Sequence, residues 1–407
     1  MNCAELRSDI DKLEQEFQVL EENIEAIRKE EEHNKELQEV AKLIGSNSAD
    51  LMLEKYLKDF QERNLDIFPV VTLGERIDIR DAYGGTADVY NITAAGNGHV
   101  LIGGDDGVFY AGSYNERGEL ELGERIDIMN AGGDPAYIRA ITALDDKRVL
   151  IGGYGGAFYV GSYDSQGGLE LGNRIDIDDA NGRVANIKTI ATTNDGHVLI
   201  GGDKGVLYVG LYDGQRTLAL GKRIDIRDAD GRPASINSIA VTEDGHVLIG
   251  GNRGVLYEGF YNDHGELELG ERIDIKNADG YPACIRAITA LDDKRVLIGG
   301  YGGAFYVGSY TEQGKLELGE RVDIRDAEGN PATVRSIVVD DDGHVLIGGD
   351  RGAFFSGFYD NQGKLTLGDR IDIRNAGGDP AYIRAITALD DKRVLIGGQY
   401  GALYVGS

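Results

Sequence analysis

The fold is decided by a stretch of 49 residues, 122–170, which reads LGERIDIMNAGGDPAYIRAITALDDKRVLIGGYGGAFYVGSYDSQGGLE. Near-copies of this unit fill most of the chain, and each copy opens on an LGxR segment. The leucines of these segments follow one another at intervals of 49 residues, at Leu73, Leu122, Leu171, Leu220, Leu269, Leu318 and Leu367. A fixed period of this length indicates a repeat architecture built from seven copies of one supersecondary unit.

Each unit contains four short apolar segments separated by turn residues. In residues 122–170 we expect strands at Ile138–Leu144, Arg148–Gly152 and Ala157–Tyr163, and a fourth that begins at Leu169 and continues into the next LGxR segment. A four-stranded antiparallel meander that recurs seven times is typical of propeller blades. The sequence therefore predicts an all-β, seven-bladed β-propeller.

Glycine and Asx residues mark the predicted turns. The first two strands of a unit meet at Asp146-Lys147, which becomes Asp244-Gly245 in the fourth unit. An Asx-Gly pair favours a two-residue hairpin, because both of its central positions need positive φ. We expect the Gly152-Gly153 pair, with the glycines that follow it, to supply the next turn. The GGxxG runs lack a following helix, so we interpret them as turns and not as phosphate loops.

The two ends of the repeat region complement each other. The seventh unit stops at Ser407, directly after its third strand, and lacks an outer strand. The segment Asp66–Thr72 precedes the first LGxR and is strand-like. We predict that this N-terminal strand completes the seventh blade, which would remove an open sheet edge. The propeller would then span residues 65–407.

The segment IxxIxxDxxGHVLIGGxxG, as in residues 236–254, resembles the repeat of two-component-regulator-type and WD40-like propellers. The resemblance covers residues 65–407 and supports the fold. It departs from both patterns, because the chain has no tryptophan and hence no Trp-Asp pair. No functional residue carries over, and propellers host many functions.

The sequence of residues 1–64 predicts a helical arm. A heptad stripe runs through three heptads at Leu6, Ile10, Leu13, Phe17, Leu20, Ile24 and Ile27. Such a stripe favours a coiled coil, although Glu16 would face Glu21 of the partner helix in a parallel homodimer. A second helix is expected at about residues 51–62. Self-association, packing within the chain and a more basic partner helix all remain open for this arm.

The charge excludes some partners. The chain has 70 acidic and 42 basic residues, a net charge of −28. Residues 1–66 hold 18 acidic and 9 basic residues, so they carry −9 and leave −19 for the repeats. Both parts would repel nucleic acid and anionic lipid.

Two cysteines allow no disulfide framework, and no apolar run is long enough to span a membrane. We expect a cytoplasmic protein, with export without a cleaved signal as an alternative.

Metal and cofactor sites are not expected. Asp340-Asp341-Asp342-Gly343 resembles the start of a calcium loop but lacks the glutamate at position 12. Four histidines share one repeat position just after the first hairpin, where the other three units have arginine. We interpret the four histidines as solvated hairpin side chains. They are His99, His197, His246 and His344.

The candidate binding site comes from a position at which the copies differ. It lies at the start of each innermost strand, where the strands should line the mouth of the central channel. Five of its seven residues are cations, which suggests a site for an anionic or carboxylate-bearing ligand. The alternative is that these cations pair with Asp81 and the other loop carboxylates at its repeat position. The seven residues are Tyr90, Arg139, Lys188, Asn237, Arg286, Arg335 and Arg384.

These observations favour a non-catalytic interaction scaffold. It would bind a protein or a small anionic ligand at a propeller face or at the channel mouth, and the arm would mediate association. The repeats show no Ser/His/Asp arrangement and no set of metal ligands, so we expect no catalytic residue and no cofactor. Two alternatives are a hydrolase or lyase with its site in the channel, and a lectin with one shallow site on each blade.

Overall fold

The computed structural model describes residues 71–406, apart from segments 96–97, 116–118, 146, 164–167, 180, 213–217, 243, 263–264, 293, 312–313, 341–342, 360–363 and 390–392. The chain divides into two compact units, Met1–Phe68 and Pro69–Ser407. The predicted arm and its heptad stripe lie outside the described residues, so arm-mediated association stays a prediction. Within the described part, no helix combines the length and apolar character that crossing a membrane requires.

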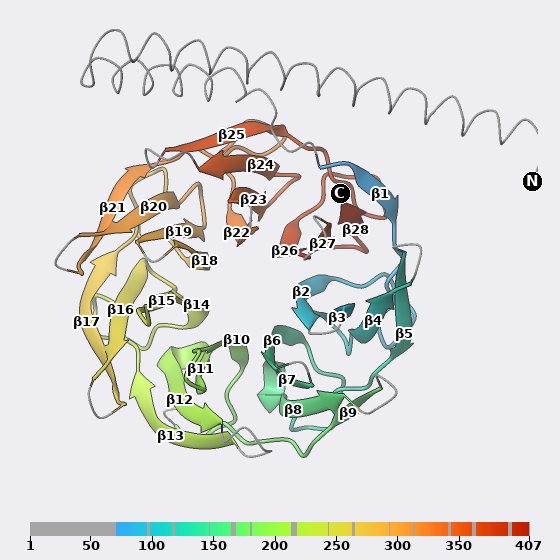
Figure 1. Ribbon diagram of the computed structural model, residues 1–407, viewed down its shortest axis with the longest axis horizontal. Coiled ribbons are helices and arrows are strands. Elements are labelled where there is room, and N and C mark those ends of the chain that lie inside the picture. Colours follow the sequence, from blue (N-terminus) through green and yellow to red (C-terminus); the bar gives the residue numbers. More distant parts are fainter. Residues whose placement is uncertain are drawn as a thin grey trace, which may run out of the picture. The chain divides into compact units, whose positions relative to one another are not determined.

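Seven four-stranded antiparallel sheets form the blades of a propeller (Figure 1). The innermost strands are β2 (Val89–Ala95), β6 (Ile138–Asp145), β10 (Ile187–Thr192), β14 (Ile236–Val241), β18 (Ile285–Asp292), β22 (Val334–Val339) and β26 (Ile383–Ala388). The second strands are β3 (His99–Gly104), β7 (Arg148–Gly153), β11 (His197–Gly202), β15 (Val247–Gly251), β19 (Arg295–Gly300), β23 (His344–Gly349) and β27 (Val394–Gly398).

The outer half of each blade has the same order. The third strands are β4 (Phe109–Tyr114), β8 (Phe158–Tyr163), β12 (Val206–Tyr212), β16 (Val255–Tyr261), β20 (Phe305–Tyr310), β24 (Phe354–Tyr359) and β28 (Leu403–Gly406). The outermost strands are β5 (Leu120–Arg125), β9 (Leu169–Leu171), β13 (Leu218–Asp225), β17 (Leu267–Asp274), β21 (Leu316–Arg321), β25 (Leu365–Arg370) and β1 (Leu73–Arg76). We number the blades 1 to 7 from β2, so that blade 7 contains β26, β27, β28 and β1.

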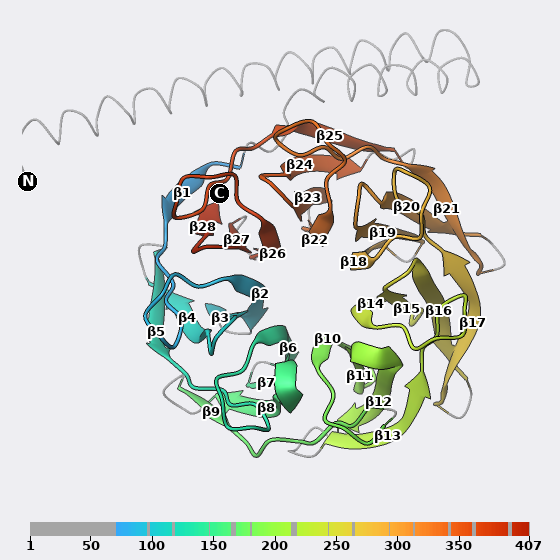
Figure 2. The same ribbon diagram turned by 180° about the vertical axis from the view of Figure 1, so that it is seen from behind.

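The predicted closure of the seventh blade is confirmed, with a shift of the strand. β1 pairs antiparallel with β28, so the two ends of the repeat region share one sheet (Figure 2). The pairing strand is Leu73–Arg76, from the first LGxR segment itself, whereas the sequence placed it before Leu73. Val71 adds an apolar contact to the same blade, because it packs against the core beside Tyr404. Segment 66–70 lies outside the described residues.

The core lies between blades and not within them. Seven clusters of buried apolar residues each join two neighbouring sheets. In one of them Leu101 and Phe109 of blade 1 pack against Ile138, Val149 and Ile151 of blade 2. Burial of this kind is the main favourable contribution to folding, and here it accrues only when blades stand side by side.

The paired glycines belong to strands, which corrects their interpretation as turn residues. Gly201 and Gly202 end β11. A Cβ atom on Gly201 would lie 2.7 Å from Cγ2 of Ile236 in the next blade, and one on Gly202 would lie 2.3 Å from the backbone oxygen of Asn186. The turn that follows is made by Lys204 and Gly205, with φ of +55° and +74°. The first glycine of the pair therefore allows close contact with the neighbouring blade, and the second allows close approach of the innermost strand of its own blade.

The predicted two-residue hairpin is also wrong where glycine is present. The N–H of Thr242 donates to the oxygen of His246, and the N–H of Gly245 donates to the oxygen of Thr242. These bonds enclose three residues, 243–245. Of the two that the structure describes, Asp244 and Gly245, only Gly245 has positive φ. This is the geometry of a turn closed by a glycine in the left-handed region.

Side-chain hydroxyls link the innermost strands at all seven junctions between blades. At four junctions a threonine donates to the backbone oxygen of the next blade, as Thr142 does to Ile190 at 2.9 Å. At the other three, a hydroxyl two positions earlier accepts from the next blade's N–H, as Ser238 does from Ile288 at 3.0 Å. The bond between Thr387 and Ile92 closes this circle.

Candidate functional site

All seven predicted site residues occupy the second position of an innermost strand. In every blade the pairing register shifts there; in blade 2, Ile138 pairs with Gly153 and Ala140 with Gly152. Arg139 is thus the extra residue of a β-bulge. Bulges redirect one side chain and are frequent beside functional sites. The sequence predicted the position, but nothing in the repeat pattern indicated the bulge.

The structure brings the seven residues together around one cavity of about 270 Å³ in the channel. Its wall contains Arg139, Lys188, Arg286, Arg335 and Arg384. No aspartate, glutamate, histidine or cysteine contributes to that wall among the residues that the structure describes. A cationic wall without carboxylates is unusual in a chain of net charge −28, and it favours anions over other ligands.

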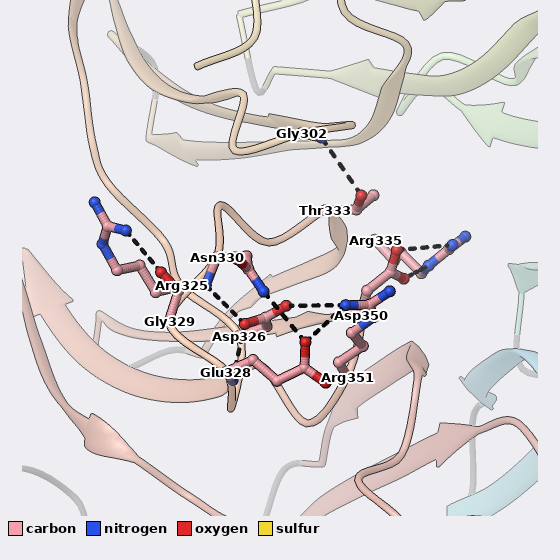
Figure 3. A network of polar contacts seen from close by, with 10 residues as sticks. All are labelled: Gly302, Arg325, Asp326, Glu328, Gly329, Asn330, Thr333, Arg335, Asp350 and Arg351. Carbon is pink, nitrogen blue, oxygen red and sulfur yellow. Dashed lines mark hydrogen bonds and ion pairs between the residues drawn. The ribbon is translucent and has the colours of Figure 1, made fainter. Parts of the chain in front are cut away.

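Two of the five cations are neutralised from behind the wall. Lys188 Nζ lies 2.5 Å from Asp203 Oδ1. Arg335 contacts both carboxylate oxygens of Asp350, and its Nη2 lies 3.2 Å from Oδ2 (Figure 3). In each pair the carboxylate comes 15 residues after the cation and lies just beyond the second strand.

The predicted alternative, pairing with carboxylates at the repeat position of Asp81, is therefore wrong in its partners. Those carboxylates accept hydrogen bonds from their own loops and lie near other cations. Asp326 accepts from the N–H groups of Glu328 and Asn330, both at 2.9 Å (Figure 3). Its second oxygen lies 3.9 Å from Arg351, outside the cavity wall.

The other three cations meet few carboxylates or none. The residues 15 positions after Arg139, Arg286 and Arg384 are Tyr154, Tyr301 and Gln399, which carry no charge. Arg384 lies 3.7 Å from Asp88 in the neighbouring blade. Within the described parts of the chain, no carboxylate forms an ion pair with either Arg139 or Arg286.

Tyr90 holds two of these guanidinium groups. The Cζ atom of Arg139 lies 3.7 Å from the centre of its ring, and that of Arg384 lies 4.6 Å away. Arg139 also lies 5.0 Å from the ring of Tyr154. The Nε atoms of Arg139 and Arg384 are buried and have no hydrogen-bond partner among the described residues. Burial raises the pKa of Tyr90, so its phenol stays neutral between the two cations.

Arg286 is the most isolated charge of the site. It forms no hydrogen bond or ion pair with any residue that the structure describes. Burial, followed by repulsion from Arg335 and Arg139, lowers the pKa of its guanidinium. Burial and the charge of Arg335 likewise lower the pKa of Arg384. A buried charge without a partner is costly unless a counter-charge binds it.

The histidines do not lie free in solvent, which corrects their interpretation. His99 stacks on Tyr163 of the next blade with ring centres 4.7 Å apart, and His197 stacks on Tyr261 at 4.4 Å. Where arginine replaces histidine the contact persists, because Arg393 lies 3.6 Å from the ring centre of Tyr114. This position joins blades; its tyrosine partner lies too far along the sequence to be recognised.

A second cavity, of about 420 Å³, lies between blades 3 and 4 at the opposite ends of the strands. Its acidic side chains bond within their own hairpins: Asp195 contacts His197 at 2.9 Å, and Asp244 contacts the hydroxyl of Thr242 at 2.5 Å. Throughout the described residues, no three His, Cys, Asp or Glu side chains are grouped to hold a metal ion.

Comparison with solved structures places the chain among β-propellers. The extracellular domain of the putative hybrid two-component system BT4673 from B. thetaiotaomicron is 18% identical, with a TM-score of 0.55 over 81% of this chain and 39% of that domain. The likeness is one of fold. The WD40 β-propeller domain of Doa1 is 12% identical, with a TM-score of 0.54 over 84% of this chain and 98% of that domain.

The same architecture is shared with proteins of other kinds. A putative 6-phosphogluconolactonase from Bacteroides uniformis is 15% identical, with a TM-score of 0.53 over 69% of this chain and 84% of that protein. The chain spans about two fifths of the length of the BT4673 domain. No family model and no curated protein matches the sequence. The predicted resemblance to two-component-regulator and WD40 propellers is confirmed at the level of fold.

Proposed function

We propose that the chain is a non-catalytic binding protein that takes an anionic ligand at the mouth of its propeller channel. The observation that carries this proposal is the cavity wall, which presents five cations and, among the described residues, no carboxylate in an acidic protein. Arg139 and Arg286 lack a carboxylate partner among the described residues, so a bound anion would neutralise charges that the fold has left uncompensated.

Binding fits this wall better than catalysis does. A general acid or base for hydrolysis is most often a histidine or a carboxylate, and the described cavity wall contains neither. The wall's phenol at Tyr90 has a raised pKa and is stacked between two guanidinium groups. These features support recognition of charge as the task of the site.

Thermal unfolding of the full-length protein with added anions tests the proposal. A polyvalent carboxylate or phosphate that binds only the folded state should raise stability in a saturable way, by about 2.7 kcal/mol at a hundredfold excess over Kd. The double variant Arg286→Gln/Arg384→Gln should lose that response. Chloride at matched ionic strength separates binding from screening. Equal stabilisation by chloride and by the polyvalent anions, in both proteins, would rule out the site.

A further inference from the structure

We infer that the ligand of this site is a small linear dicarboxylate that lies across the channel, with one carboxylate at Arg139 and Arg384 and the other at Arg286. The inference rests on the proposed anion site and adds the number, spacing and kind of the charged groups. It follows from where the three arginines sit in the ring and from what each of them still has free.

The first carboxylate position is built around Tyr90. Arg139 and Arg384 come from the blades on either side of it and place their guanidinium groups 3.7 and 4.6 Å from its ring centre. A cation that stacks on a ring uses the face of its guanidinium group. The edge, with its N–H donors in fork geometry, stays available for a carboxylate. Both Nε atoms are buried without an acceptor among the described residues, so a carboxylate in the cavity would meet the Nη donors.

The second position lies on the far side of the channel. Arg286 stands on β18 in blade 5, and β18 faces β2 and β6 across the centre of the propeller (Figure 1; Figure 2). In a ring of seven, blade 5 is three steps from both blade 1 and blade 2. Arg286 is therefore opposite the junction at which Tyr90 and Arg139 meet. Both positions line the same cavity, so two carboxylate groups on a short chain could occupy them together.

Charge and volume indicate the same ligand. Five cations line the cavity, and three carboxylates contact them from behind, at Asp88, Asp203 and Asp350. Even with Asp105, which is charged near neutral pH beside Asp88, the cations outnumber the carboxylates. The cavity of about 270 Å³ has room for a small organic anion. A linear dicarboxylate of four or five carbons would place one negative charge at each of the two positions.

Isothermal titration calorimetry on the full-length protein tests this inference with succinate, glutarate and acetate. Each dicarboxylate should bind at one site per chain, at least about tenfold more tightly than acetate, because its second carboxylate gains charge-assisted bonds to Arg286. Arg286→Gln should weaken dicarboxylate binding by about 10- to 100-fold and leave acetate binding nearly unchanged. Arg286→Lys should restore part of the loss, since it keeps the charge.

Arg232→Gln is the matched control. It removes the same unit of charge from an exposed side chain that does not line the cavity, so dicarboxylate binding should be unaffected. Circular dichroism melting without ligand should show that Arg286→Gln is folded. If acetate binds as tightly as succinate, or Arg286→Gln weakens both equally, the dicarboxylate inference is wrong while the anion site stands. If no anion binds the wild-type protein, the proposed function fails as well.

Discussion

Tyr163, Tyr261 and Tyr310 each bury a phenolic oxygen that has no hydrogen-bond partner among the described residues. A histidine of the preceding blade packs against each of these rings, stacked on Tyr163 and Tyr261 and tilted against Tyr310. In blade 2 an arginine stands at the histidine position, and Arg148 donates to the hydroxyl of Tyr212. These three histidine copies keep the ring contact but lack the hydrogen bond that Arg148 makes, which leaves a buried unsatisfied oxygen.

His99→Arg should stabilise the protein. The new guanidinium would retain the contact with Tyr163 and supply the donor that its hydroxyl lacks, which is worth about 1 kcal/mol of unfolding free energy. Urea denaturation measures the change. Tyr163→Phe provides the check through a double-mutant cycle: it should cost little in the wild type and more in the arginine variant. Additive effects would contradict the proposed bond.

Asp105 should make the propeller less stable as the pH rises. Burial, opposed by a bond from the N–H of Asp88, raises the pKa of Asp105 to about 6. The folded state then binds more protons than the unfolded state between about pH 4 and 6. The unfolding free energy falls across that window and stays lower above it. The negative charges of Asp88 and Asp106 act in the same direction.

Asp105→Asn should remove this pH dependence, because the amide oxygen can still accept from Asp88. The variant should melt above the wild type at pH 7 to 8, and the two should converge below about pH 4. The difference should be small, since water screens a half-buried side chain. A wild-type protein that gains stability between pH 4 and 6, relative to the variant, would show that the pKa of Asp105 is not raised.

The site shows what a single sequence reveals at this scale. The candidate site from Tyr90 to Arg384 was found at a repeat position where the seven copies differ. A ligand in the channel does not need the same side chain from every blade. The carboxylates that neutralise Lys188 and Arg335 were missed. Their reach depends on how the chain turns after the glycine pair and on the bulge, and neither can be read from residue spacing.

At the scale of strands, the copies use two interchangeable ways of joining neighbouring blades. Thr142 donates to the oxygen of Ile190, and the position two residues earlier is Ala140. In blade 3 the arrangement is reversed: Thr189 accepts from the N–H of Ile239, and Ala191 stands two residues later. Each junction therefore has one hydroxyl bond, made either to a backbone oxygen or to a backbone N–H of the next blade.

Thr142→Ala should destabilise the protein by about 1 kcal/mol, because the oxygen of Ile190 loses its donor. Adding Ala140→Thr should restore most of that loss by reproducing the blade 3 arrangement. Denaturant midpoints of the single and double variants measure both effects. A double variant no more stable than Thr142→Ala alone would show that the two arrangements are not equivalent.

Strand positions were predictable from the sequence because the repeat averages over seven copies. The predicted Ile138–Leu144, Arg148–Gly152 and Ala157–Tyr163 differ from β6, β7 and β8 by one residue at single ends. The closing strand was misplaced because the apolar segment Asp66–Thr72 looks as much like a strand as the LGxR segment Leu73–Arg76 does. The hydrogen-bonding partner β28 decides between them, and pairing across the whole chain is not a local property.

At the scale of the molecule, the propeller is a ring with one interruption. Ser407 corresponds in the repeat to Ser162, and Val71 corresponds to Leu169. The six residues between Ser162 and Leu169, YDSQGG, are thus the only part of the period that the seventh blade lacks. The seven interblade clusters and seven hydroxyl bonds are continuous across this gap. The place of the break should therefore matter little, provided that it falls within a blade.

Two circular permutants of residues 71–407 test this view, both with Ser407 joined to Val71 through YDSQGG. The first opens the chain within a blade, between Tyr261 and Leu267, and so keeps a strand from each end in one sheet. The second opens it between blades at Gly280, an exposed turn with φ of +82°. Global unfolding midpoints should be similar, because both retain the same buried contacts.

Local opening should separate the two permutants. In the first, parting the ring breaks a β ladder as well as an interblade cluster; in the second, only the contacts between blades 4 and 5 hold it shut. Native-state hydrogen exchange reports such sub-global opening. Amides of β14 and β18 should exchange faster in the second permutant than in the first, while those of β2 and β6 should be alike in both. Equal exchange at β14 and β18 would mean that packing between blades closes the ring without help from the shared sheet.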